Sequence, residues 1–139
     1  MRMAIIAVSE AFRPPLWRVL LLTALFARAS FAGPSLSFDQ AILHLTPPLP
    51  GEASSSGAFC FSNITQSAVR IISVTSSCSC THAVATEGSV APGAVARLLV
   101  SLDTAGRYGL QRKRLIVKTD QGEKYTLTVV LELPAAPPP

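Results

Sequence analysis

The chain has few of the residues from which catalytic sites are usually built. Only 14% of its 139 residues are charged, and it has two histidines, His44 and His82. Its carboxylates are scattered, and it contains neither a Gly-x-Ser-x-Gly nucleophile motif nor a glycine-rich phosphate-binding loop. The spacing suggests no acid–histidine–nucleophile set. We therefore expect that the protein is not an enzyme.

A hydrophobic run long enough to span a membrane is also missing. The apolar segment 19–27 is nine residues long, whereas a spanning helix needs about 20 residues. Arginines precede this segment, and small residues at cleavage spacing follow it and end at Ala32. We expect residues 1–32 to be a cleaved signal peptide. The mature protein would then be periplasmic or secreted, without a membrane span.

Removing the signal peptide nearly abolishes the net charge. The full chain has 12 Lys and Arg against 8 Asp and Glu, but residues 1–32 hold four of the arginines and one of the acids. Residues 33–139 therefore carry 8 against 7, a net charge of +1. This balance predicts no nucleic-acid partner. The one basic cluster, Arg112-Lys113-Arg114, is typical of the solvated end of a strand.

The rest of the chain alternates between apolar and polar residues, without helical periodicity. Leu127, Val129 and Leu131 share one face of a predicted strand, and Thr126 and Thr128 share the other. Residues 96–102 and 115–117 alternate in the same way, Phe59 and Phe61 share a face, residues 69–74 are rich in β-branched side chains, and residues 41–45 form an early strand. These patterns predict half-buried β-strands.

Turn residues separate the predicted strands. Ala91-Pro92-Gly93-Ala94 is typical of a type II turn, and Asp120-Gln121-Gly122 of a tight hairpin. Residues 47–57 are predicted to be a connector. About seven strands predict an all-β fold, an immunoglobulin-like antiparallel β-sandwich over residues 33–134. A disordered Ala/Pro tail is expected at residues 135–139.

The candidate chemistry lies in the motif Cys78-Ser79-Cys80-Thr81-His82. In an extended segment Cys78, Cys80 and His82 would line one side. The two thiols and the imidazole could bind copper(I). A mutual disulfide would need a local turn, because Cα atoms two apart in a strand sit near the upper limit of about 6.8 Å. The third alternative is that the thiols only pack.

Cys60 is an odd cysteine, and it lies between Phe59 and Phe61. It is expected to point away from the face that the two rings bury. Pairing with Cys78, with Cys80 or with another chain is open, as is an unpaired, covered thiol. A structural zinc site at the motif would need a fourth ligand, and Cys60 and His44 are the candidates.

Four segments together resemble a known family. They are Phe59-Cys60-Phe61-Ser62-Asn63, residues 71–81 with the two cysteines, Ala91-Pro92-Gly93, and residues 106–113. In this order they are similar to the bacterial family catalogued as domain of unknown function 1573, over residues 37–133. The resemblance implies an exported immunoglobulin-like sandwich without an assigned activity.

The resemblance also bears on two single residues. Ser79 stands where the family has glycine, which reduces the freedom for positive φ between the cysteines. Asn63-Ile64-Thr65 matches a glycosylation sequon. In a bacterial family, however, Asn63 is expected to close a turn in the left-handed conformation instead.

We therefore expect an exported, non-enzymatic structural or interaction module without a cofactor. Its partner, a protein or another component of the cell envelope, is not named by the sequence. The alternative is a periplasmic copper-binding or thiol-redox protein that uses Cys78, Cys80 and His82.

Overall fold

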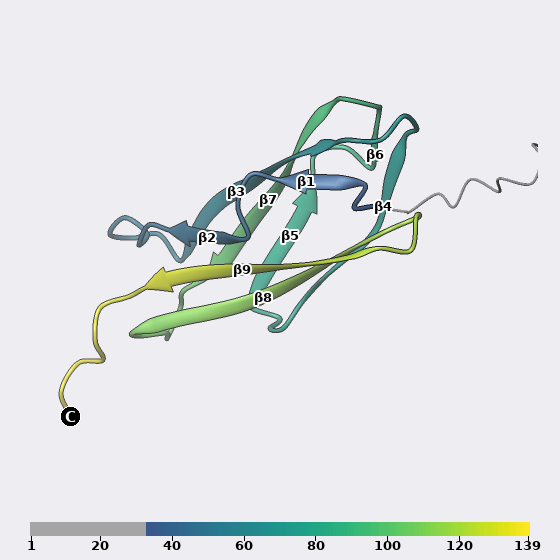
Figure 1. The fold of residues 1–139 in the computed structure, drawn as a ribbon. Helices are drawn as coiled ribbons and strands as arrows, with labels where there is room; N and C mark the ends of the chain where they lie inside the picture. Colours follow the sequence, from purple (N-terminus) through teal and green to yellow (C-terminus); the bar gives the residue numbers. More distant parts are fainter. Residues whose placement is uncertain (1–32) are drawn as a thin grey trace, which may run out of the picture. The chain divides into compact units, whose positions relative to one another are not determined.

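Strands follow the alternating segments of the sequence, because an extended backbone directs every second side chain to the same face. The computed structural model describes residues 33–139, and this part of the chain has nine strands and no helix (Figure 1). The strands are β1 (Leu36–Phe38), β2 (Ile42–Leu45), β3 (Ser54–Asn63), β4 (Val69–Ser76), β5 (Thr81–Ala85), β6 (Ser89–Val90), β7 (Val95–Asp103), β8 (Leu110–Thr119) and β9 (Lys124–Glu132). None of the described residues forms a helix that could cross a membrane. The predicted signal peptide, residues 1–32, lies outside the described residues.

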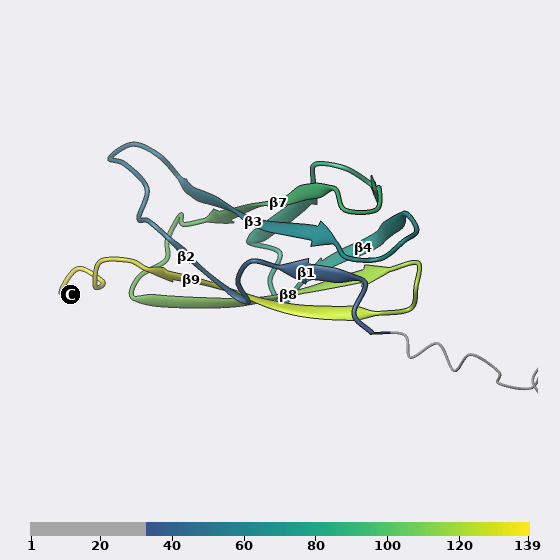
Figure 2. The same ribbon diagram turned by 45° about the horizontal axis from the view of Figure 1, so that its top comes forward.

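The strands form a sandwich of two sheets, as the all-β immunoglobulin-like class predicts. One sheet has the order β1-β3-β7-β5 and the other β2-β9-β8-β4-β6. Figure 2 shows β3 and β7 in one layer and β8 and β9 in the other. The described residues form nine strands, two more than the predicted number of about seven. The additional strands include β1 and β6, which have only three and two residues. Strands this short show no alternation.

One strand pair departs from the predicted antiparallel arrangement. β2 runs parallel to β9, with Leu43 opposite Val129. The antiparallel expectation is therefore wrong at this edge of the five-stranded sheet. Alternation assigns side chains to a face of a sheet, but it contains no information about strand direction.

The core between the sheets is built from the side chains predicted to face inward. Leu127, Val129 and Leu131 are 2%, 0% and 0% exposed, whereas Thr126 is exposed and Thr128 half-buried. This confirms the faces assigned to the last strand. Other large, fully buried side chains are Phe59, Phe61, Leu98, Leu102 and Leu115. Residues 33–139 belong to one compact unit, so this part of the chain contains a complete core.

The turn predictions are confirmed at both tight turns. The N–H of Ala94 donates to the carbonyl of Ala91 at 3.0 Å, and Gly93 between them has a φ of 72°. Gly122 has a φ of 84° and donates to the carbonyl of Thr119 at 3.1 Å. Positive φ at these positions favours glycine. The predicted connector 47–57 is too long, because β3 begins at Ser54.

The expected left-handed conformation of Asn63 is wrong, since no described residue other than glycine has positive φ. Asn63 is instead 1% exposed and uses its side chain as a bridge. Its amide nitrogen donates to the carbonyls of Ser67 at 2.7 Å and Val90 at 2.8 Å. Its amide oxygen accepts the backbone N–H of Thr65 at 2.9 Å. Asn63 thus joins the β3–β4 turn to β6.

A polar cluster fixes the start of the domain to the β8–β9 hairpin. The backbone N–H of Ser35 donates to Glu123 at 2.8 Å, and the Ser35 hydroxyl contacts the same carboxylate. The hydroxyl of Tyr125 donates to Glu123 at 2.7 Å and accepts the N–H of Leu36 at 2.9 Å. Burial alone would raise the pKa of Glu123, but these hydrogen bonds outweigh it and lower the pKa below 4.5.

We expect this cluster to make stability depend on pH in the acid range. A carboxylate with a lowered pKa in the folded state stabilises fully above its unfolded pKa, and this contribution is lost as the pH falls through the folded pKa. Urea midpoints at about pH 6 and about pH 3 should therefore differ more for the wild type than for Glu123→Gln. Equal pH dependence of the two proteins would show that Glu123 does not contribute.

Candidate functional site

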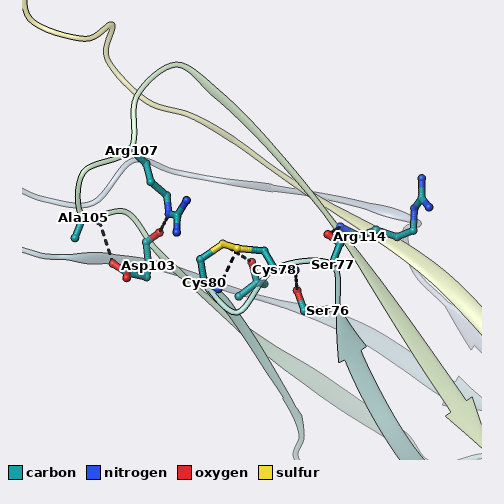
Figure 3. The surroundings of a disulfide bond; sticks show 9 residues. Ser76, Ser77, Cys78, Cys80, Asp103, Ala105, Arg107 and Arg114 are labelled. Carbon is teal, nitrogen blue, oxygen red and sulfur yellow. Dashed lines mark hydrogen bonds between the residues drawn. A yellow bond between two sulfur atoms is a disulfide. The ribbon is translucent and has the colours of Figure 1, made fainter.

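The two motif cysteines lie in the turn that connects the two sheets. β4 ends at Ser76 and β5 begins at Thr81. A disulfide joins Cys78 to Cys80, with their Cα atoms 5.1 Å apart (Figure 3). The N–H of Thr81 donates to the carbonyl of Cys78 at 3.2 Å, which closes a four-residue turn.

The extended arrangement predicted for Cys78, Cys80 and His82 is wrong. Residues two apart in a strand have Cα atoms near the upper limit of about 6.8 Å for a disulfide. The turn shortens this distance to 5.1 Å. It does so without positive φ at Ser79, since only glycines have positive φ among residues 33–139. Serine at position 79 is therefore compatible with the turn.

Hydrogen bonds to both sheets hold the turn in place. The N–H of Ser77 donates to the carbonyl of Arg114 at 2.9 Å, and the N–H of Asp103 donates to the carbonyl of Cys80 at 2.8 Å. In Figure 3 the guanidinium of Arg107 donates to the Asp103 carbonyl, at 2.9 Å. None of these three bonds uses a sulfur atom. The turn therefore has supports that do not depend on the disulfide.

The two cysteines differ in their exposure to solvent. Cys80 is 4% exposed and belongs to the core, whereas Cys78 is half-buried and packs against it. The hydroxyl of Thr81 lies 3.7 Å from the sulfur of Cys80. An external thiolate thus has better access to Cys78, and Cys80 would be the leaving group.

His82 lies away from the buried sulfur. It is exposed, lies opposite Ser101 of β7, and follows the buried Thr81, so it belongs to the outer face of the four-stranded sheet. The described part of the chain contains no group of three His, Cys, Asp or Glu side chains that could hold a metal ion. The predicted ligand set of Cys78, Cys80 and His82 is therefore not assembled in the disulfide form.

Cys60 is the free cysteine of the described residues. It is half-buried between the buried Phe59 and Phe61, so its side chain takes the opposite face, as expected. In the register of the sheet it lies opposite Arg97 of β7. His44, the other candidate fourth ligand, is exposed on β2 in the other sheet.

Sequence reasoning missed the groups that fix the cysteine turn. Arg114 and Asp103 lie more than 20 residues from the cysteines in sequence, and they contribute backbone atoms only. The residue type does not reveal the contacts of a backbone carbonyl or N–H. The local signal was the pair Ser76 and Ser77, whose hydroxyls accept the N–H groups of Cys78 at 3.3 Å and Arg114 at 3.0 Å.

The fold and this turn define a class, namely a small immunoglobulin-like sandwich with a Cys-x-Cys disulfide in the connection between its sheets. The chain belongs to the family described as protein of unknown function, DUF1573, whose model matches residues 37–132. The resemblance seen in the sequence is thus confirmed. None of the curated proteins matches the chain.

Several solved structures share the fold. A protein of unknown function from Porphyromonas gingivalis W83 is 20% identical with a TM-score of 0.60, and the match covers 70% of this chain and 46% of that one. The VesB protease of Vibrio cholerae is 23% identical with a TM-score of 0.53, covering 70% and 32%. A family 123 glycoside hydrolase from Clostridium perfringens is 11% identical with a TM-score of 0.53, covering 71% and 24%. In each case the match covers less than half of the other protein. These identities establish similarity of fold alone.

Proposed function

We propose that the protein is an exported, non-enzymatic interaction module that binds an extended segment of a partner protein at its β5 edge. The observation that supports this most is a set of exposed aliphatic side chains at that edge. Val84 is 66% exposed, Leu99 lies opposite it in the sheet and is 47% exposed, and Ile72 on β4 is 60% exposed. Monomeric proteins seldom leave neighbouring apolar side chains uncovered without a function.

The backbone at this edge supports the same proposal. Among the strands of residues 33–139, β5 is the last of its sheet and pairs only with β7, so no described strand pairs with its other side. A groove of about 240 Å³ runs between β4 and β5. It is lined by Ile71, Ile72, Ser73, Val74, Ala83, Val84, Ala85 and Gly88. An added strand would gain main-chain hydrogen bonds from the edge and place apolar side chains in the groove.

Charge substitutions test this proposal. In a bacterium that expresses the protein, the wild type should migrate on native size analysis as a complex larger than the free chain. Leu99→Glu should migrate as the free chain, because a buried carboxylate without a partner is costly at an apolar interface. Thr126→Glu, exposed on the other sheet, is the matched control. Equal behaviour of the two variants would contradict the proposal.

The disulfide supports a second candidate function, thiol exchange. An incoming dithiol would reduce the Cys78–Cys80 bond to two thiols and itself be oxidised to a disulfide, with a mixed disulfide at Cys78 as the intermediate. A disulfide that spans a single residue closes a very short loop. In the chain-entropy model such a loop contributes only about 1.5 kcal/mol. Both sulfurs can therefore change oxidation state at little cost to the fold.

We expect the double variant Cys78→Ser/Cys80→Ser to remain folded. Its free energy of unfolding should fall by no more than about 1.5 kcal/mol, because the entropy that the short loop removes from the unfolded chain is small. It should also lose the mass increase of two hydrogen atoms on reduction and any copper(I) binding by the reduced protein. Cys60→Ser is the control and should retain both. An unfolded double variant would show that the cysteines are packing residues.

A further inference from the structure

The outer face of the β8–β9 hairpin concentrates the positive charge of the domain. Of the eight Lys and Arg in residues 33–139, five lie on β8 and β9. Leu115 and Val117 of β8 are fully buried, so the even-numbered residues of this strand face outward. The outward cations are Arg112, Arg114 and Lys118 on β8 and, opposite Lys118 in register, Lys124 on β9. These four residues define the basic face.

The positions of the cations on this face do not stabilise the free protein. Lys118 and Lys124 lie directly opposite each other, and like charges in such a pair destabilise a sheet. Of the three acids in residues 110–132, the exposed Glu132 lies opposite Leu110 at the end of this face, and the other two are engaged elsewhere. Asp120 accepts the backbone N–H of Arg70 at 3.0 Å, and Glu123 belongs to the cluster at the start of the domain. The basic face therefore remains suited to an anionic partner.

The basic face contains a hollow whose lining side chains could donate hydrogen bonds to a phosphate group. It has a volume of about 390 Å³ and is lined by Ser77, Arg112, Lys113, Arg114 and Thr128. The ladder between β4 and β8 ends at the pair Ser76 and Leu115. The next residue of β8, Arg114, still bonds Ser77 through its backbone N–H and carbonyl, and among the described residues no strand pairs with residues 110–113 on this side. Guanidinium groups and hydroxyls donate the charge-assisted hydrogen bonds that phosphate oxygens accept.

Two exposed aliphatic side chains flank the cations. Leu110 precedes Arg112 on the same side of β8 and is 58% exposed. Ile42 of β2 is 49% exposed and lies in one cross-strand row with Thr128 and Arg114. Cations beside exposed aliphatic groups are typical of proteins that bind at the boundary between lipid headgroups and acyl chains. A purely acidic protein surface would not use the aliphatic groups.

We propose that the basic face docks on an anionic phospholipid bilayer, with a headgroup phosphate in the hollow at Arg112 and Arg114 and with Leu110 and Ile42 at the acyl boundary. This site lies on the outer face of the five-stranded sheet, away from the β5 edge, and is independent of the proposed protein-binding function. Each cation near an anionic membrane strengthens binding by about fivefold. The attraction weakens as salt increases.

Vesicle sedimentation of residues 33–139, which contain the complete core, tests the proposal. The protein should bind phosphatidylglycerol vesicles at low salt and leave phosphatidylcholine vesicles unbound. Arg114→Glu changes the charge by two units and should weaken binding by about 25-fold. Arg97→Glu makes the same change on the exposed face of the other sheet and should weaken binding by less than about threefold, because its charge is farther from the lipid. Thermal unfolding of each variant establishes that it is folded.

The other outcomes would overturn the proposal. The proposal is wrong if the wild type does not bind phosphatidylglycerol vesicles. It is also wrong if Arg114→Glu and Arg97→Glu weaken vesicle binding equally, since only net charge would then matter. Release from the vesicles by millimolar glycerol phosphate would indicate a site for the free phosphate ester. Arg114-dependent binding to polyglutamate, without binding to vesicles, would indicate an acidic protein partner.

Discussion

Leu127→Ala is expected to lower the free energy of unfolding by about 2–5 kcal/mol. Leu127 is 2% exposed and lies opposite the fully buried Leu115 in the β8–β9 ladder. Its truncation removes buried apolar surface and leaves a cavity between the sheets. A domain of this size has a total stability of about 5–15 kcal/mol. The variant should therefore be marginally stable, and a urea titration measures the loss directly.

Thr128→Ala is the matched control on the neighbouring position of the same strand. Its side chain is half-buried on the outer face, so the urea midpoint should change little. Similar losses in the two variants would contradict the core described here.

Asn63→Ala should have the second-largest effect, a loss of about 2–4 kcal/mol. The substitution leaves the carbonyls of Ser67 and Val90 without the amide donor that they share. Val90 is fully buried, so water cannot readily replace the lost hydrogen bond. The β3–β4 turn and β6 should both become less ordered, which hydrogen exchange would detect.

Two further substitutions separate the parts of this network. Asn63→Asp keeps an acceptor for Thr65 but has no amide donor, and it should destabilise about as much as alanine. Thr65→Val removes a hydroxyl that donates to Asn63 at 2.7 Å, but keeps the backbone bond, and should cost about 1 kcal/mol. If Asn63→Asp were as stable as the wild type, the donor role of Asn63 would be refuted.

The core was predictable from the sequence because buried apolar residues recur at every second position of a strand. Leu127, Val129 and Leu131 are buried as their alternation indicated. The two tight turns were predictable because Pro92, Gly93 and Gly122 restrict or extend the backbone conformations available. The direction of β2 was not predictable, since parallel and antiparallel strands can share the same alternation.

The candidate site was less predictable than the fold. Two cysteines separated by one residue are compatible with a strand or a turn, and the choice depends on hydrogen bonds from Ser77 and Asp103 to distant segments. The role of Asn63 was misassigned for a similar reason. Asparagine is common in left-handed turns, and the two carbonyls that it satisfies are contributed by residues later in the chain. The basic face likewise required the strand register, which brings Lys124 opposite Lys118.

Photo-crosslinking from the β5 edge tests the central claim, that the protein is an interaction module, most directly. A photoreactive amino acid is placed at Val84 or at Thr126, which is exposed on the other sheet, and irradiated in the producing bacterium. We expect a discrete protein adduct from position 84 that is absent from position 126 and disappears when Leu99→Glu is added. The same adducts from both positions, or no adduct from position 84, would contradict it.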